Sequence, residues 1–303
     1  MRHLGAFGWR RTGLLVGVPL MVVTLLLTAL MLTRTPATRV AAPGPTGSQG
    51  GLQIAPGDDG PEAGQVPVAA PAPTHLPVVD YGPAPTGFPP DPNTMDVTPL
   101  TEGLRPARRI AAYDAPGGLP IAFLDPTING VDLTVPIAQR RTGWVAVLLP
   151  SANRRLAWVP SGGWTATPLR NQIVIERRPH RLTWLRDGEP RRTWPVSLGR
   201  PGQETPLGRS FVLGRSTPGE SVYAGVDVLA LGSVPDDPDA VPAGLRGAHI
   251  GIHTWHHDGE LGRQTTNGCI RLTASGQRLL LAEVPPGSPV VVVDELPTPP
   301  PSV

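Results

Sequence analysis

The chain contains no lysine and only one cysteine, so its 26 basic side chains are all arginines and no disulfide can form within it. The arginines are scattered and nearly balanced by 24 acidic residues, which leaves a net charge of +2. A concentrated basic surface of the kind that binds nucleic acid is therefore not indicated. The sequence also lacks a glycine-rich phosphate-binding loop, a dinucleotide fingerprint and internal repeats.

The single cysteine, Cys269, lies within residues 249–272, which also hold four of the seven histidines. Alternating apolar and polar residues predict a strand that ends at His253, and a turn before Cys269 leads into a second predicted strand over 270–272. This pattern places a thiol and an imidazole at the ends of neighbouring strands. A nearby histidine activates a thiol, and Gly268 permits a sharp turn that aims backbone amides at a developing oxyanion. The residues alone predict a cysteine acyl-transfer site, with a small buried cysteine as the alternative.

A metal site is the rival chemistry for this stretch, because His249, His253, His256 and His257 join Cys269 as possible ligands. However, no glutamate follows His253 as it does in the His-Glu-x-x-His motif. The strand period also places His249 about 13 Å from His253. We therefore expect no metal, and we expect His256 and His257 to lie in a solvated loop.

Residues 252–254 (Ile-His-Thr) and 266–272 (Thr-Asn-Gly-Cys-Ile-Arg-Leu) together resemble the signature of the L,D-transpeptidase (YkuD-like) catalytic domain. Two residues depart from the family pattern. Thr254 stands where glycine or serine is commoner, and Asn267 replaces a histidine. The family's general base corresponds to His253, so we expect Asn267 to alter hydrogen bonding in the loop rather than to remove the base.

The resemblance extends to Thr-Pro-Leu-Gly at 205–208 and covers about 171–294. It implies a mainly β, sandwich-like catalytic domain with a short helix, which the sequence places at 273–281 with Thr273 or Ser275 as its cap. In the family layout, 221–239 corresponds to a lid. Short strands are expected over 172–176, 181–185, 194–199, 210–213 and 290–293.

The resemblance also implies an activity. Cys269, activated by His253, would attack a peptidoglycan stem tetrapeptide, expel the terminal D-amino acid and form a thioester, which an amine of a second stem resolves into a 3→3 cross-link. No cofactor is implied, and carbapenem-type inhibitors would acylate the cysteine. Supporting roles fall to Gly268, Thr254, Thr266 and Asn267 around the oxyanion and the loop, and substrate contacts to Arg271, Tyr223 and Trp255. Two alternatives remain open: an L,D-carboxypeptidase, in which water resolves the thioester, and a non-catalytic cell-wall-binding scaffold.

The N-terminal part predicts a membrane anchor and a tether. An uncharged apolar run over 14–32 follows three arginines, and at 1.5 Å per residue it reaches about 28 Å, close to the thickness of a bilayer's hydrocarbon core. The arginines favour a cytoplasmic N-terminus and a catalytic part outside the cell membrane, or a secreted protein if the segment is cleaved. The following residues are rich in Pro, Gly and Ala and predict a disordered linker.

Between the linker and the catalytic part, short β-type runs with turn signals predict a small all-β module. Gly-Trp-Val-Ala-Val at 143–147 and Ala-Trp-Val at 157–159 are similar to strands of bacterial SH3-like modules, which often precede such catalytic domains in high-GC actinobacteria. We expect Trp144, Trp158 and Trp164 to be core residues. The predicted division is 1–12 cytoplasmic, 13–33 membrane anchor or signal sequence, 34–100 linker, 101–168 SH3-like β domain, 169–295 catalytic domain and 296–303 disordered tail.

Overall fold

The computed structural model describes residues 66–151, 154–218, 223–234 and 250–296. All of them belong to one compact unit that begins at Gly60. This part of the chain is mainly β with one short helix, as the sequence predicts. The elements are β1 Glu102–Pro106, β2 Ile110–Tyr113, β3 Pro120–Leu124, β4 Thr127–Ile128, β5 Val131–Asp132, β6 Val135–Arg141, β7 Trp144–Leu148, β8 Leu156–Pro160, β9 Trp164–Pro168, β10 Asn171–Glu176, β11 Arg181–Arg186, β12 Glu189–Pro195, β13 Leu198–Gly199, β14 Gly208–Ser216, β15 Val228–Gly232, β16 Gly251–His253, β17 Gln264–Thr266, β18 Ile270–Arg271, α1 Ala274–Glu283 and β19 Pro289–Val293.

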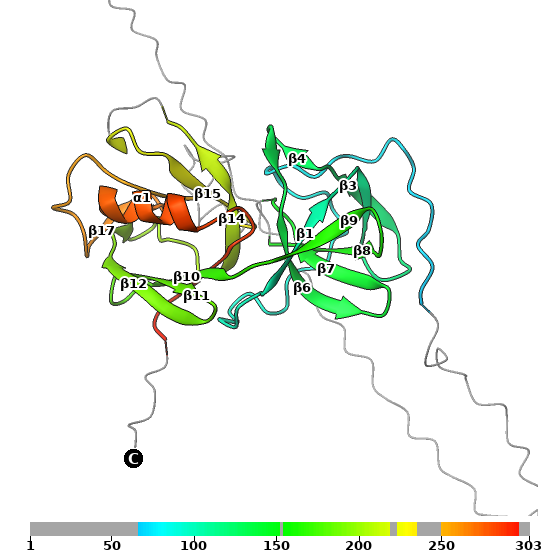
Figure 1. Cartoon of the computed structure of the whole chain (residues 1–303), viewed down its shortest axis with the longest axis horizontal. Helices are drawn as coiled ribbons and strands as arrows, with labels where there is room; N and C mark the ends of the chain where they lie inside the picture. The colour runs from blue at the N-terminus through cyan, green and yellow to red at the C-terminus, as the bar shows by residue number, and fades with distance from the viewer. Residues whose placement is uncertain (1–65, 152–153, 219–222, 235–249, 297–303) are drawn as a thin grey trace, which may run out of the picture. The chain divides into compact units, whose positions relative to one another are not determined.

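The first sheet has seven antiparallel strands in the order β3-β2-β8-β7-β6-β1-β9 (Figure 1). Its valines, leucines and alanines form one core, and β7 is buried along its whole length. Trp144 and Trp158 lie in this core, as predicted, whereas Trp164 packs against it half-buried. Whether this sheet is an SH3-like domain with the predicted boundaries stays a prediction.

The second sheet has eight strands in the order β12-β11-β10-β19-β14-β15-β16-β18 and mixes parallel with antiparallel pairs (Figure 1). Strands β10 and β19 pair in parallel and are buried on both faces, which explains their continuous Val and Ile runs. Helix α1 packs Leu280 and Leu281 into the core on one side. Thr273 caps the helix by accepting a hydrogen bond from Gly276 N at 3.1 Å.

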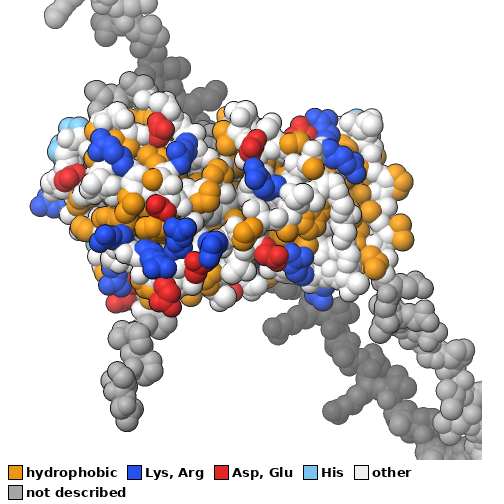
Figure 2. Space-filling model, viewed as in Figure 1, with side chains coloured by type: hydrophobic (Ala, Val, Ile, Leu, Met, Phe, Trp, Pro, Cys, Tyr) orange, Lys and Arg blue, Asp and Glu red, His pale blue; other side chains and the backbone are white. Residues whose placement is uncertain are grey.

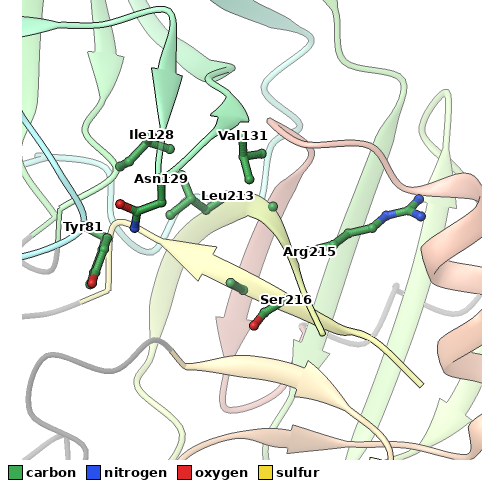
Figure 3. A pocket seen from close by; sticks show the side chains of 9 residues that line it. Tyr81, Ile128, Asn129, Val131, Leu213, Arg215 and Ser216 are labelled. Carbon is green, nitrogen blue, oxygen red and sulfur yellow. The ribbon is translucent and has the colours of Figure 1, made fainter. Parts of the chain in front are cut away.

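Strand β14 joins the two cores because its side chains alternate between them. Phe211 and Leu213 belong to the core of the first sheet, and Val212 belongs to that of the second. The β4–β5 hairpin also reaches β14, and its Asn129-Gly130 turn has the two positive φ angles, 49° and 78°, that a tight type I′ turn requires. A cavity of about 400 Å³ lies between this hairpin and β14, and Figure 3 shows side chains from both along its walls.

The predicted disordered linker over 34–100 is wrong for residues 66–100, which pack against both sheets. Val79 and Phe88 are buried, and the Val79 amide donates to the Phe123 carbonyl at 2.8 Å. The Pro, Gly, Ala, Thr and acidic residues that dominate 34–100 suggested disorder. In 66–100, however, apolar side chains pack on the first sheet, and prolines reduce the conformational freedom that folding removes. The remainder of the predicted linker lies outside the described residues.

A buried ion pair fixes this segment to β14. Asp91 accepts two hydrogen bonds from the Arg209 guanidinium, at 2.5 and 2.6 Å, and both side chains are almost fully buried. The Arg209 amide donates to the Thr94 carbonyl at 2.6 Å. Arg154 lies nearby and donates to the carbonyls of Ser233 and Leu207. Burial lowers the pKa of Arg154 to about 10, and the Asp91 carboxylate opposes this shift.

Two further predictions need correction in the second sheet. Residues 228–232, expected within a lid, form β15, whose Leu229 and Leu231 are buried between β14 and β16. Flanking Gly, Pro and Asp residues concealed this strand. The single strand expected over 194–199 is instead the end of β12 followed by the separate β13, which pairs with β17.

The predicted membrane anchor at 13–33 and the tail from 297 lie outside the described residues. Within the described ranges, no helix is long and apolar enough to cross a membrane. On the face drawn in Figure 2, arginine and acidic side chains are interspersed. Exposed pairs such as Arg140–Glu102, with N and O 2.6 Å apart, contribute little to stability.

Replacing Asp91 with alanine should destabilise the fold strongly, because Arg209 would remain buried without its counter-charge. The expected loss is about 3–5 kcal/mol in the free energy of unfolding, measured by chemical denaturation of the full chain. Asp132→Ala is the matched control: it breaks the solvent-exposed pair with Arg105 and should cost at most about 1 kcal/mol. Equal effects of the two substitutions would contradict the structural role of the buried pair.

Candidate active site

The site lies where β16 and β18 pair in parallel, at one edge of the second sheet. Ile252 is opposite Ile270, and His253 is opposite Arg271. Cys269 immediately precedes β18, so strand alternation places its side chain on the same face as Arg271 and His253. Gly251 lies two residues before His253 on β16, where a Cβ would lie 2.8 Å from Val228 Cγ1. The predicted strand-end placement of thiol and imidazole is thus what the backbone pairing produces.

His253 is buried, and one of its ring nitrogens is fixed. Its Nδ1 lies 2.6 Å from the carbonyl oxygen of Thr254. A carbonyl oxygen only accepts, so Nδ1 carries the hydrogen and Nε2 keeps a free lone pair. Burial lowers the pKa of His253 to about 4; the hydrogen bond to Thr254 opposes this shift, and the Arg271 cation adds to it. The ring is therefore neutral at pH 7 and able to accept a proton at Nε2.

Cys269 is a free cysteine, and the residue as a whole is half-buried. Burial of the sulfur raises the pKa of the thiol, while a hydrogen bond from the Gly251 backbone and the positive charge of Arg271 act in the opposite direction. The resting state at neutral pH is thus a protonated thiol together with a neutral imidazole, not a thiolate–imidazolium pair. Such a thiol becomes nucleophilic when its proton moves to a base during attack.

The turn before the cysteine is held by Thr266. Its hydroxyl donates to the Cys269 carbonyl at 2.6 Å and accepts from the Gly268 amide at 3.1 Å. Gly268 has φ 108°, a backbone conformation that favours glycine, and a Cβ there would lie 3.0 Å from Ile250 Cδ1. Because the Gly268 amide is already bonded to Thr266, our assignment of it as an oxyanion donor does not fit this state. Asn267 is exposed at the tip of the turn.

Arg271 is held between an acid and an aromatic ring. Its Nη1 lies 2.8 Å from Glu260 Oε2, and its Cζ lies 3.7 Å from the centroid of the Trp255 ring. Glu260 Oε2 also accepts from Thr265 Oγ1 at 3.1 Å. Arg271 Nε is buried and has no hydrogen-bond partner among the described residues.

Aromatic rings form one wall beside the imidazole. The Tyr223 ring centroid is 5.0 Å from that of His253 and 6.1 Å from that of Trp255. The Thr254 hydroxyl donates to the Tyr223 carbonyl at 2.6 Å, which ties this wall to β16. The structure thus brings Tyr223, Trp255, Arg271 and His253 together, and their assignment as substrate contacts stays a prediction.

Several residues that shape the site were missed by sequence reasoning. Glu260 neutralises Arg271, and its carbonyl accepts from Ser197 Oγ at 2.7 Å. Ser197 also exchanges both backbone hydrogen bonds with Arg271. Gln277 on α1 donates from its side-chain amide to the Ile252 carbonyl at 2.9 Å and so ties β16 to the helix. Only Glu260 gave a usable signal, as an acidic residue in the loop between the two halves of the motif. Ser197 and Gln277 bond backbone carbonyls of elements distant in sequence, which no motif indicates.

The rival metal site has little support in the described ranges. No group of three His, Cys, Asp or Glu side chains there could hold a metal ion. His256 and His257 are exposed, with ring centroids 4.3 Å apart. His249, the further ligand considered above, lies outside the described residues.

Comparison with known proteins relates this segment to one family. Residues 170–292 match the family model described as YkuD, the L,D-transpeptidase catalytic domain. A search of curated proteins found no match. Among solved structures, an L,D-transpeptidase from Mycobacterium smegmatis is 20% identical, with a TM-score of 0.35, and the match covers 52% of this chain and 82% of that one.

Two further structures are similar at the same level. L,D-transpeptidase 3 from Mycobacterium tuberculosis, in complex with a faropenem-derived adduct, is 16% identical with a TM-score of 0.35, and the match covers 52% of this chain and 92% of that one. The L,D-transpeptidase LdtMt1, in complex with imipenem, is 17% identical with a TM-score of 0.35, over 50% and 90% of the two chains. These TM-scores are low, so the proposed function rests on the family match over 170–292 and on the geometry of the site.

Alkylation of the single cysteine tests the electrostatics of the site directly. Because burial raises the pKa of Cys269, the pH midpoint of its reaction with iodoacetamide should be higher in the native chain than in the same chain unfolded in urea. Intact-mass spectrometry gives the rate of alkylation at each pH. The pH midpoint of this rate reports ionisation of the thiol, whereas restricted access of the reagent lowers the rate at every pH without moving the midpoint. Arg271→Gln should raise the midpoint further, since it removes a cation that favours the thiolate. A native midpoint below that of the unfolded chain would contradict this account.

Proposed function

We propose that the chain is a peptidoglycan L,D-transpeptidase that uses Cys269 as nucleophile and His253 as general base. The observation that supports this most is the hydrogen bond from Nδ1 of His253 to the Thr254 carbonyl, 2.6 Å long. It leaves the Nε2 lone pair on the sheet face that Cys269 shares, within a segment that matches the catalytic-domain family. A buried cysteine that merely packs would have no need of a fixed neutral base.

In the proposed reaction, the Cys269 sulfur attacks the carbonyl carbon between the L- and D-configured centres of a stem tetrapeptide as its proton moves to His253 Nε2. The negative charge develops on the carbonyl oxygen, for which the Cys269 amide is the remaining candidate donor. Collapse of the intermediate breaks the peptide bond, and His253 returns the proton to the departing amine. The product is a thioester on Cys269 and a free D-amino acid.

The second half of the reaction reverses these roles. An amine of a second stem peptide attacks the thioester, His253 takes its proton, and the thiol is restored as the 3→3 cross-link forms. A base with a pKa near 4 stays neutral over the whole neutral range, so both halves remain possible there. Because burial lowers the pKa of His253, the ring is protonated only below about pH 4. A proton on Nε2 would then prevent the ring from acting as a base, so activity should be lost there.

Arg271, Tyr223 and Trp255 are the proposed substrate contacts. The Glu260 carboxylate offsets much of the Arg271 charge and fixes the guanidinium beside the ring of Trp255. The aromatic wall offers flat apolar surface for the stem peptide. Peptidoglycan lies outside the cell membrane. We therefore propose that residues 13–33 anchor the enzyme in the membrane with its catalytic part on the cell-wall side.

Incubation with a carbapenem should produce one covalent adduct on the full chain, detected by intact-mass spectrometry. Cys269→Ala should show none. His253→Gln should slow adduct formation by about 10²–10⁴-fold, the usual contribution of a general base. His256→Gln, which alters an exposed neighbour in the same loop, is the matched control and should react like the wild type. If the folded wild type forms no adduct, a non-catalytic wall-binding scaffold becomes the better assignment.

The choice of acceptor separates transpeptidation from hydrolysis. Given a stem tetrapeptide as donor and a second stem with a free side-chain amine, the enzyme should yield mainly the cross-linked dimer, detected by liquid chromatography and mass spectrometry. Tripeptide alone would instead identify an L,D-carboxypeptidase that passes the same thioester to water. The Cys269→Ala variant should give neither product, which controls for contaminating peptidases.

A further inference from the structure

A second recognition feature lies on the first sheet, in a part of the chain that does not contribute to the cysteine site. Residues 66–73, Val-Pro-Val-Ala-Ala-Pro-Ala-Pro, run along this sheet outside any helix or strand and are here called the proline segment. Trp144 Nε1 donates to the Pro67 carbonyl at 2.8 Å, and the Tyr113 hydroxyl donates to the Ala70 carbonyl at 2.7 Å. We call Tyr113 and Trp144 the aromatic pair.

The aromatic pair presents two hydrogen-bond donors, one on each ring, on the same side of the first sheet. Tyr113 ends β2 and Trp144 begins β7, and their rings meet edge to face with centroids 5.2 Å apart. Each ring packs into the core while its polar atom points to the proline segment. Trp144 is only 2% exposed, whereas Val68, above it in the segment, is 86% exposed. The segment therefore lies on the surface as a ligand would, rather than inside the core.

The spacing of the bonded carbonyls identifies the kind of chain that fits. Pro67 and Ala70 are three residues apart, which is the repeat of a polyproline II helix. This helix has no internal hydrogen bonds, so its carbonyls are free to accept from outside. Prolines at 67, 71 and 73 hold the backbone in that conformation before it binds. Aromatic grooves that recognise proline-rich peptides use the same principle.

Two glycines make room for the segment. A Cβ on Gly117 would lie 2.9 Å from the Pro67 Cβ, and a Cβ on Gly143 would clash with the Val66 side chain. Both glycines also have positive φ, at 70° and 75°. The two turns that border the aromatic pair are thus shaped to admit an extended chain at close range.

We propose that the aromatic pair is a binding site for an extended Pro/Ala-rich segment of a partner polypeptide, and that the proline segment occupies this site in cis. The chemistry is that of the cis ligand itself: two carbonyls three residues apart, with Val68 and Ala69 between them and prolines at 67, 71 and 73. A tethered ligand has an effective concentration in the millimolar range, so the site is closed until a competing segment displaces it. This site is independent of Cys269 and of the proposed reaction.

The test uses the full chain and a fluorescein-labelled peptide with the sequence of residues 65–74. In one variant Pro67→Gly, Val68→Ser, Ala69→Gly and Ala70→Ser are combined to weaken the cis ligand and leave the aromatic pair intact. The peptide should bind this variant at least tenfold more tightly than the wild type by fluorescence anisotropy. Adding Trp144→Phe, which keeps a ring but removes the donor, should weaken binding about fivefold. A peptide with glycine in place of all three prolines is the control and should bind poorly.

A second measurement does not depend on the combined variant. Elastase cuts after small residues such as Val68 and Ala69, so its cleavage of the wild type reports release of the proline segment. Excess unlabelled peptide, Trp144→Phe or Tyr113→Phe should each speed this cleavage several-fold. The proposal is overturned if no peptide binds to the folded variant, or if the two donor substitutions change neither measurement. Dimers formed by exchange of the proline segment would assign the site to a second copy of this chain instead of a partner.

Discussion

The buried ion pair between Asp91 and Arg209 is the constraint on which the arrangement of the sheets depends. Arg209 is the second residue of β14, the strand whose alternate side chains enter the two cores. The pair fixes the beginning of β14, β14 pairs with β15, and β15 pairs with the β16 strand that carries His253. A charge interaction far from the cysteine in sequence is thus connected through two strand pairings to His253. Since unpaired charges are expensive to bury, alternative registers of β14 are disfavoured.

At the site itself, order comes from backbone pairing more than from side-chain contacts. Parallel pairing of β16 with β18 places the imidazole and the thiol on one face, and hydrogen bonds to Thr254 and Thr266 set the tautomer of the ring and the shape of the turn. Arg271 acts on both groups, since its positive charge lowers the pKa values of His253 and Cys269 alike. Glu260 limits that charge, so one ion pair influences the pKa values of His253 and Cys269 together.

Prediction from sequence succeeded where local signals and tertiary structure agree. The helix after Thr273, the valine-rich strand over 290–293 and the strands on either side of the motif follow from periodicity and capping. It failed where order comes from distant partners. Residues 66–100 have a composition typical of a linker but pack against both sheets, and β15 is hidden between Gly, Pro and Asp. The hydrogen bond from the Gly268 amide to the Thr266 hydroxyl depends on the exact shape of the turn, which the sequence pattern does not specify.

The protonated resting state of Cys269 has a consequence for its oxidation. Oxidants such as hydrogen peroxide react with thiolates, and a thiol that is ionised reaches sulfenic and then irreversible sulfinic acid readily. A pKa raised by burial keeps the population of thiolate small. The sulfur therefore reacts slowly with such oxidants at neutral pH. Desolvation of the sulfur thus protects the single cysteine of the chain against slow oxidation.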